Sequence, residues 1–144
     1  MSQQKIIIQQ VKQQRLMPLF YHSDLQVCLG VVKALYKAGI RCIEFTNRGE
    51  AAMDNFKALI ASRKESMPDL FLAVGTIRTV EQANDFMDAG ADFLISPVFD
   101  AAICKLAQSK KVWWIPGCMT PTEIHVAEHA GCKFVKLFPG NLLG

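Results

Sequence analysis

Two ionisable side chains stand inside apolar runs of the sequence, where buried strands are expected. Lys136 lies between Val135 and Leu137 in the run KFVKLF, and Glu44 lies in the run RCIEF. Runs of this length, rich in β-branched and aromatic residues, are typical of strands in a protein core. A buried charge is costly unless it is paired or neutralised. Both residues are therefore candidates for a functional site.

The chemistry that such a pair supports is Schiff-base formation. The pKa of a lysine amine is about 10.4 in water, and burial lowers it, so that the neutral amine becomes accessible. A neutral amine attacks a carbonyl carbon, and a nearby carboxylate can move the protons. We therefore predict that Lys136 and Glu44 are catalytic. The alternative is a structural ion pair that braces the interior.

An internal repeat places these two residues at equivalent positions. The segments AGIRCIEF, AGADFLIS and AGCKFVKL each begin with Ala-Gly and continue as an apolar strand. Gly39, Gly90 and Gly131 are typical of the left-handed residue that follows a helix. Glu44 and Lys136 are each the fifth residue after the glycine. Because side chains alternate along a strand, the two should share one face and one height, near the carboxyl ends of their strands.

Helices are predicted between the strands. The segments 23–26 and 79–82 fit a capping box, and the segment 120–123 adds a proline at the first helical position. Apolar residues at helical spacing follow each of them. The glutamine-rich segment 1–15 is predicted to form an opening helix that packs on the end of the domain.

Six strands are predicted, each separated from the next by a helix: 17–21, 40–45, 70–74, 92–96, 112–115 and 133–138. This alternation predicts a parallel sheet with right-handed crossovers. The two architectures that fit are an open doubly wound sheet and a (β/α)8 barrel. No G-x-G-x-x-G motif follows the first strand, so the barrel is favoured.

The length bears on the domain organisation. A chain of 144 residues is enough for one domain with a core, whereas barrels of this type typically need about 200 residues or more. We therefore expect residues 1–144 to be a single barrel domain with about six β/α units, truncated before strands seven and eight.

Composition and motifs exclude several classes of function. The net charge is only +3, and no block of Lys or Arg is present, which disfavours nucleic-acid binding. The apolar run Ile6 to Ile8 is too short for a membrane span or a signal-peptide core. Five cysteines without a C-x-x-C motif indicate a reduced, cytoplasmic protein.

Histidines and tryptophans elsewhere in the sequence are further candidates for a site. His125 and His129 fit the zinc-protease pattern H-x-x-E-H, but a third ligand is not evident, so no metal is predicted. His22 is predicted to act at a helix entry. Trp113 and Trp114 are predicted to lie in a strand core or a subunit contact.

Five motifs in order resemble the 2-keto-3-deoxy-6-phosphogluconate (KDPG) and 4-hydroxy-2-oxoglutarate aldolase family: IEFTNRG (43–49), AVGT (73–76), ISP (95–97), IPGCMTPTE (115–123) and FVKLFP (134–139). The resemblance implies a cytoplasmic, usually trimeric class I aldolase on a (β/α)8 barrel, without cofactor or metal. Its substrate would be a small 2-keto acid. The family cleaves KDPG to pyruvate and glyceraldehyde 3-phosphate, and 4-hydroxy-2-oxoglutarate to pyruvate and glyoxylate.

The resemblance also implies residue roles. Lys136 matches the lysine that forms the imine, and Glu44 matches the general acid/base. The substrate-binding positions are Arg48 and Thr76 at the substrate carboxylate, and Pro97 and Phe138 in the pocket wall. Gly75, beside Thr76, is added because a glycine lets the backbone approach a ligand closely.

Some positions depart from the family pattern. Gly49 stands where a hydroxyl residue is common, Val98-Phe99 where glycine is common, and Gly140 where alanine is common. These changes leave the preferred 2-keto acid open. The family's phosphate site lies on loops after strands seven and eight, which this sequence does not contain. Two rivals remain, a non-catalytic keto-acid-binding barrel that keeps a structural Lys-Glu pair and a metal-dependent barrel lyase.

Overall fold

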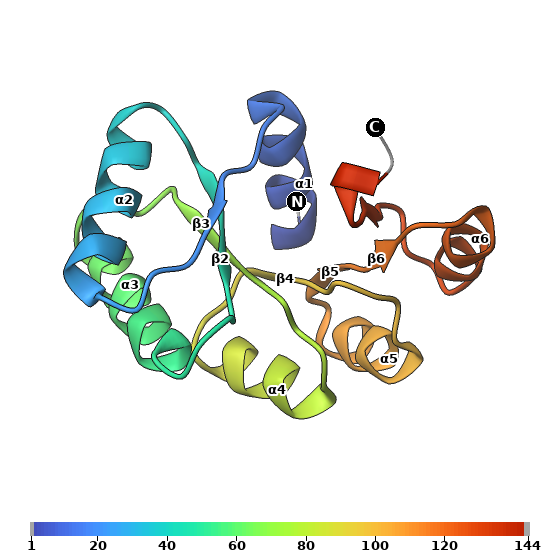
Figure 1. Cartoon of the computed structure of the whole chain (residues 1–144). Helices are drawn as coiled ribbons and strands as arrows, with labels where there is room; N and C mark the ends of the chain where they lie inside the picture. The colour runs from blue at the N-terminus through green and yellow to red at the C-terminus, as the bar shows by residue number, and fades with distance from the viewer. Residues whose placement is uncertain (1, 143–144) are drawn as a thin grey trace.

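The computed structural model describes residues 2–142, in which parallel strands alternate with helices (Figure 1). In chain order the elements are α1 (Gln3–Gln14), β1 (Leu19–Phe20), α2 (Leu25–Lys37), β2 (Cys42–Thr46), α3 (Ala52–Ser66), β3 (Phe71–Gly75), α4 (Val80–Asp88), β4 (Phe93–Ile95), α5 (Ala101–Lys110), β5 (Trp113–Ile115), β6 (Gly117–Cys118), α6 (Pro121–His129), β7 (Lys136–Leu137) and the 3-10 turn η1 (Gly140–Leu142).

The strands pair in the order of the chain. One parallel sheet has the order β1-β2-β3-β4-β5, and β6 pairs with β7 in parallel. Only Pro116 separates β5 from β6, so a single stretch of chain pairs first with β4 and then with β7. A doubly wound sheet would instead reverse its strand order near the middle. The sequential order therefore confirms the (β/α)8 barrel type, with β1 and β7 as edge strands of the described part.

The fifth strand ends at Ile115 as predicted, but an unpredicted strand, β6, follows it. Pairing resumes after Pro116, whose carbonyl accepts a hydrogen bond of 2.8 Å from the Lys136 amide. The predicted buried strand 133–138 is reduced to β7. Because β7 pairs on one side only, Leu137 is 55% exposed and Phe138 is 39% exposed.

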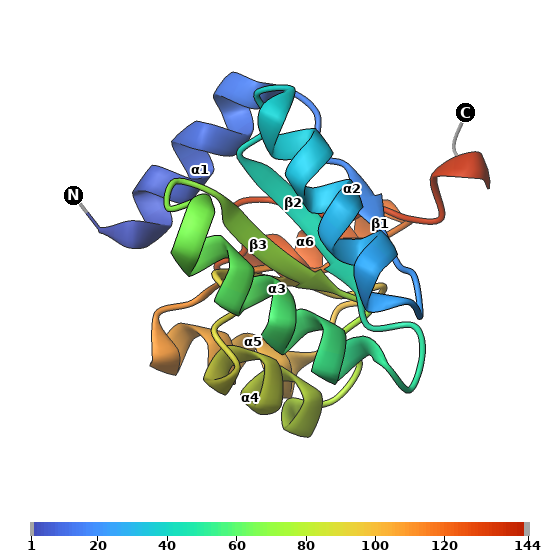
Figure 2. The same cartoon turned by 90° about the vertical axis from the view of Figure 1, so that its left-hand side faces the viewer.

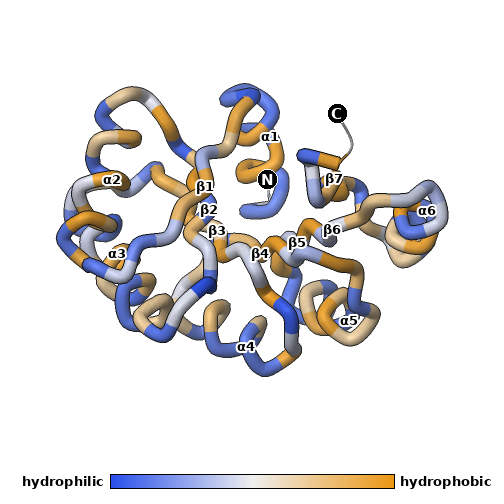
Figure 3. Tube along the Cα trace, in the orientation of Figure 1, coloured by the Kyte–Doolittle hydropathy of each residue, from blue (hydrophilic) through white to orange (hydrophobic). Residues whose placement is uncertain are grey.

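Most residues of the central strands β3 and β4 are apolar and appear as orange tube in Figure 3. Their side chains are buried in two clusters, one on each face of the sheet. On the inner face, Ala73, Phe93 and Trp113 lie side by side across β3, β4 and β5. The rings of Phe93 and Trp113 stack at 5.1 Å. On the outer face, Trp114 is buried and its indole N–H donates a 2.7 Å hydrogen bond to Ser96. Both tryptophans therefore lie in the core formed by the strands, which confirms the first of the two alternatives predicted for them.

Helix α1 lies at the end of the sheet where the strands begin (Figure 2). The side-chain oxygen of Gln14 accepts hydrogen bonds from the amides of Arg41 (2.6 Å) and Cys42 (3.0 Å) at the amino end of β2. Ile7 of the same helix is 1% exposed, against the inner-face cluster. The predicted opening helix is thus confirmed, and the end where the strands finish stays free for a site.

The predicted turns and helix starts are largely confirmed. Gly39, Gly90 and Gly131 have φ values of 96°, 101° and 90°, in the left-handed region that favours glycine. Thr79 and Thr120 cap α4 and α6, and Thr120 forms a full capping box with Glu123.

The capping residue of α2 was predicted wrongly. Asp24, not Ser23, accepts hydrogen bonds from the amides of Gln26 and Val27. The Asp24 amide in turn donates to His22 Nδ1 at 3.0 Å. His22 therefore acts at a helix entry, as expected. No helix within residues 2–142 is long and apolar enough to cross a bilayer.

Candidate active site

Lys136 and Glu44 meet inside the curved sheet. The amine of Lys136 lies 3.3 Å from Glu44 Oε1 and 3.4 Å from Oε2. The two residues come from β7 and β2, which are separated by 92 positions in the sequence. Glu44 is 2% exposed. The structure therefore brings together the pair that the repeat placed at one height and on one face.

Lys136 is less buried than its sequence context indicates. Its side chain is 28% exposed, because β7 has a strand neighbour on one side only. The prediction of a fully buried lysine is wrong for this reason. The amine still lies 5.5 Å from the centre of the Phe138 ring, a distance at which the ring face attracts a cation. One side of the amine is thus lined by a carboxylate and an aromatic ring.

Burial dominates the electrostatics of Glu44. Desolvation raises the pKa of its carboxyl above the ordinary value of 4.5, and the positive charges of Lys136 and then Arg48 oppose the rise. A carboxyl group whose pKa moves up toward the working pH both gives and takes protons readily. Glu44 therefore has the environment that a proton-transfer group requires.

The raised pKa of Glu44 predicts how stability depends on pH. A raised folded-state pKa means that the stabilising contribution is complete below the ordinary value of 4.5 and is lost as the pH rises through the folded-state pKa. Relative to Glu44→Gln, which does not titrate, the wild-type free energy of unfolding should fall as the pH is raised above 4.5. Urea unfolding of both proteins over this pH range measures the difference. A wild-type free energy of unfolding that rises with pH relative to Glu44→Gln would mean that the positive charges of Lys136 and Arg48 outweigh burial.

Gly75 makes room for the Glu44 carboxylate. A Cβ atom at position 75 would overlap Glu44 Oε1, and Gly75 lies opposite Thr46 in the β2–β3 register. The sequence predicts that this glycine lets the backbone approach a ligand, and this stays a prediction. The structure shows in addition that the absence of a Cβ lets the Glu44 side chain pack against β3.

Gly75→Ala should displace the Glu44 carboxylate and destabilise the fold by about 1–3 kcal/mol, the usual cost of overpacking a core. Any activity that needs Glu44 should fall as well. The matched control is Gly30→Ala in α2, where a Cβ would meet nothing within 4 Å. This substitution should stabilise the helix by about 1 kcal/mol, because alanine favours the helical conformation more than glycine does. Urea unfolding of both variants tests the prediction, and equal stability of the two would contradict it.

Arg48 and Thr76 lie just beyond the ends of β2 and β3. The Arg48 amide donates a 2.9 Å hydrogen bond to the Thr46 carbonyl, which turns the chain away from the strand. The Arg48 side chain is exposed, and its charge is near enough to lower the pKa of Glu44. Thr76 is half-buried, with a left-handed φ of 63°. Both predicted substrate-binding residues therefore lie at the same end of the sheet as Lys136 and Glu44.

Pro97 and Phe138 face a groove of about 530 Å³ at this end of the sheet. The groove is lined by Arg78, Pro97, Val98, Gly117, Cys118, Met119, Glu123, Phe138 and Pro139. A Cβ on Gly117 would overlap the Pro97 carbonyl, so β6 lies directly against the chain that leaves β4. The sequence analysis did not predict that Arg78 and Met119 line this groove. Their positions shortly after the ends of β3 and β6 are the signal that could have indicated it.

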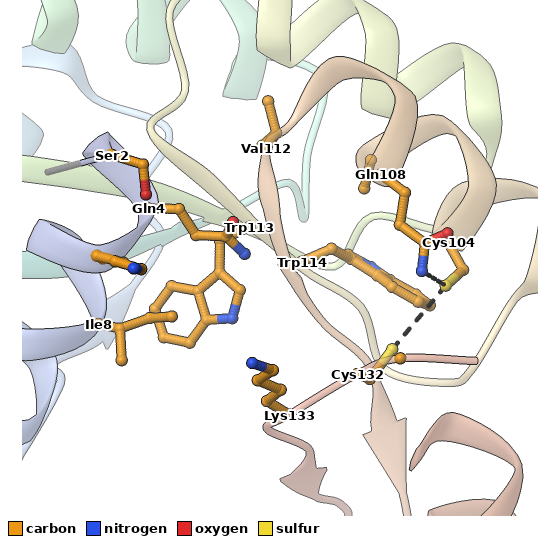
Figure 4. A pocket seen from close by; sticks show the side chains of 13 residues that line it. Ser2, Gln4, Ile8, Cys104, Gln108, Val112, Trp113, Trp114, Cys132 and Lys133 are labelled. Carbon is orange, nitrogen blue, oxygen red and sulfur yellow. Dashed lines mark hydrogen bonds between the residues drawn. The ribbon is translucent and has the colours of Figure 1, made fainter. Parts of the chain in front are cut away.

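A second cavity lies at the opposite end of the sheet, between α1, β5 and the segment after α6 (Figure 4). It is lined by Gln4, Ile8 and Lys133 among others, and neither Lys136 nor Glu44 contributes to it. The thiols of Cys104 and Cys132 lie 3.9 Å apart beside it. Burial, together with the neighbouring Cys104, raises the pKa of Cys132 to about 12. Because the Lys136-Glu44 pair does not line it, this cavity is separate from the candidate catalytic centre.

His125 and His129 lie next to each other on α6, without a third metal ligand within residues 2–142. The rings of His125 and His129 are 4.0 Å apart on α6, and His129 Nδ1 lies 3.0 Å from the His125 carbonyl. No group of three or more His, Cys, Asp or Glu side chains within residues 2–142 is arranged to bind a metal ion.

Fold and site together define a parallel β/α barrel protein with a lysine-carboxylate pair at the carboxyl ends of its strands. Residues 7–144 match the model of the KDPG and KHG aldolase family. The chain belongs to that family, which confirms the resemblance found in its motifs.

Relatives found by sequence and by structure are aldolases of the same family. The chain is 34% identical to the 2-dehydro-3-deoxy-phosphogluconate aldolase of Treponema pallidum over 96% of the chain and 64% of the relative. It is 30% identical to the KHG/KDPG aldolase of Escherichia coli over 88% of the chain and 58% of the relative. A KDPG aldolase structure from Legionella pneumophila, with pyruvate captured as a covalent carbinolamine, matches 89% of the chain and 60% of that protein, with a TM-score of 0.81 and 29% identity. The chain thus spans less than two thirds of these relatives.

Proposed function

We propose that this protein is a Schiff-base aldolase, a lyase that cleaves KDPG to pyruvate and glyceraldehyde 3-phosphate and also cleaves 4-hydroxy-2-oxoglutarate to pyruvate and glyoxylate. The observation that carries the proposal is the 3.3 Å contact between the Lys136 amine and Glu44. Related proteins named KHG/KDPG aldolase and the captured pyruvate carbinolamine of the Legionella pneumophila enzyme support it.

In the first stage, the neutral amine of Lys136 adds to the C2 ketone of the keto acid, and a proton moves from its nitrogen to the oxygen to give a carbinolamine. Glu44 then gives a second proton to this hydroxyl group, which leaves as water, and an iminium ion forms. The carbon-nitrogen bond replaces the carbonyl bond, so no oxidation or reduction occurs. The contact between the two side chains places the proton donor beside the reacting atoms.

In the second stage, the Glu44 carboxylate takes the proton of the C4 hydroxyl and the C3–C4 bond breaks. The electron pair of that bond moves to the iminium nitrogen and forms an enamine, while C4 leaves as an aldehyde. Glu44 returns the proton to C3, and addition of water then releases pyruvate and restores the amine. The iminium acts as the electron sink, so the sequence of steps needs no metal ion or cofactor.

Five residues are proposed to bind the substrate. Arg48 is well suited to take the keto-acid carboxylate, because a planar guanidinium pairs with a carboxylate through two hydrogen bonds. Thr76 and Gly75 would line the same end, and Pro97 and Phe138 would form the wall. Their common location at the ends of the strands supports these roles.

The family resemblance further supports a single barrel domain, assembled as a homotrimer in the cytoplasm and working in the Entner-Doudoroff pathway. The five cysteines are free thiols, which agrees with a reducing compartment. Light scattering in solution measures the assembly directly.

The experiment that tests the proposed function is an assay of pyruvate release from each of the two substrates. We expect release with both, and unchanged rates in the presence of a chelator. Loss of activity in chelator would favour a metal-dependent lyase. Absence of release, with tight keto-acid binding, would favour a non-catalytic binding barrel.

A further inference from the structure

Tyr21 and Gly49 are packed against each other beside the candidate site. Tyr21 immediately follows β1, and Gly49 lies in the loop between β2 and α3. A Cβ atom on Gly49 would overlap the hydroxyl group and the ring of Tyr21. The aromatic side chain therefore occupies the space that any other residue at position 49 would need.

The backbone that Tyr21 contacts carries Arg48. The Arg48 amide is bonded to the Thr46 carbonyl at 2.9 Å, and the Gly49 carbonyl accepts a 3.0 Å hydrogen bond from the Ala52 amide at the start of α3. Arg48 is thus held between the end of a strand and the first turn of a helix. Its guanidinium forms no salt bridge with any residue in the described range. The direction of this side chain consequently depends on the path of the backbone.

Tyr21 is itself fixed by the core. It is half-buried, and its ring lies 5.9 Å from the ring of Phe45. Phe45 is fully buried and stacks on Phe56 at 6.3 Å. Because the core holds its ring in place, Tyr21 limits how closely the loop at Gly49 can approach the end of β1.

From this geometry we propose that Tyr21 is a positioning residue, which sets the Arg48 loop so that the guanidinium meets the carboxylate of a 2-keto acid. The inference rests on the proposed function. Pairing through two hydrogen bonds demands a defined orientation. A displacement of about 1 Å at a binding group can reduce catalytic efficiency by up to about 100-fold. Replacing Tyr21 should therefore weaken carboxylate binding and spare the chemistry at Lys136.

The test compares pyruvate with methyl pyruvate, which has the same ketone but no free carboxylate, by borohydride reduction of the imine on the whole chain. For Tyr21→Leu we expect the half-saturating concentration of pyruvate to rise about tenfold, while the maximal trapping rate and the values for methyl pyruvate stay unchanged. The matched control is Phe20→Leu, which removes another ring from Phe45 (5.5 Å). This control should lower the melting temperature without changing the half-saturating concentration.

Two further substitutions test whether Tyr21 acts on pyruvate binding through the loop that carries Arg48. As a single substitution, Gly49→Ala should weaken pyruvate binding. Combining it with Tyr21→Leu should restore part of the lost binding, because the overlap between the two side chains is removed. In an Arg48→Ala background, Tyr21→Leu should have no additional effect. An additive effect in that background, or an equal loss for methyl pyruvate, would overturn the positioning role. If Tyr21→Leu does not fold, unchanged pyruvate binding by Gly49→Ala overturns it as well.

Failure of this inference can be distinguished from failure of the proposed function. A wild-type chain that traps neither ketone contradicts the aldolase proposal and, with it, the role of Tyr21. A wild-type chain that traps both, combined with normal pyruvate binding by Tyr21→Leu, contradicts only the role of Tyr21.

Discussion

Lys136→Ala should lower the rate of pyruvate release by at least about 10⁴-fold, the scale seen when a covalent nucleophile is removed. Without the amine, neither the iminium nor the enamine can form. The fold should survive, because Lys136 is on an edge strand and its side chain is 28% exposed. The Glu44 carboxylate would lose its partner, and the pKa of Glu44 would rise further, so the group can become neutral. Turnover and circular dichroism of the purified variant measure both expectations.

The matched control for this variant is Lys133→Ala. Lys133 precedes β7 in the same segment and is exposed, so its removal takes away an equal charge and leaves the Glu44 contact intact. This control should keep its activity. Turnover of Lys136→Ala close to that of Lys133→Ala would refute the catalytic role of Lys136.

Glu44→Gln should slow cleavage by about 10²–10⁴-fold, the usual contribution of a general acid/base, while imine formation stays detectable. The amide keeps the shape of the carboxylate but cannot transfer a proton, whereas the Lys136 amine remains in place. Rapid quenching with borohydride during a single turnover separates the imine from the released pyruvate. Slower but detectable formation of the imine, together with slow release of pyruvate, is the expected pattern.

Asp92→Asn is the matched control for the carboxylate. Asp92 is another acidic side chain whose pKa is raised by burial, but it pairs with Arg63 and accepts a hydrogen bond from the Leu72 amide, away from Lys136. Its variant should lose stability and keep its cleavage rate per folded molecule. A Glu44→Gln variant that cleaves as fast as this control would contradict the role of Glu44.

Local signals were sufficient to predict most of the fold. Gly39, Gly90 and Gly131 have the left-handed conformation that their position after a helix predicted. Thr79 and Thr120 cap their helices as expected. These features depend on a few neighbouring residues, so the sequence alone specifies them.

Features that depend on distant neighbours were predicted less well. The chain resumes pairing after Pro116 because β7 lies beside it, which no local pattern reveals. Lys136 was expected to be fully buried, but the exposure of a strand depends on what lies on both of its sides. The choice of Asp24 over Ser23 as the helix cap depends on the bond between the Asp24 amide and His22.

The candidate site was partly predictable. The shared height of Lys136 and Glu44 followed from strand periodicity, and the structure brings them within 3.3 Å. The functions of Gly75 and Gly49 could not be predicted in the same way, because a glycine does not indicate which side chain fills the space beside it. Contact with Glu44 in one case and with Tyr21 in the other appears only in three dimensions.

The most direct test of the central claim is reduction of the protein with borohydride in the presence of pyruvate, followed by peptide mapping. We expect one stably attached three-carbon acid per chain, carried by the peptide that contains Lys136. A folded protein that gains no such adduct, or gains it on another lysine, would contradict the claim that this amine is the nucleophile.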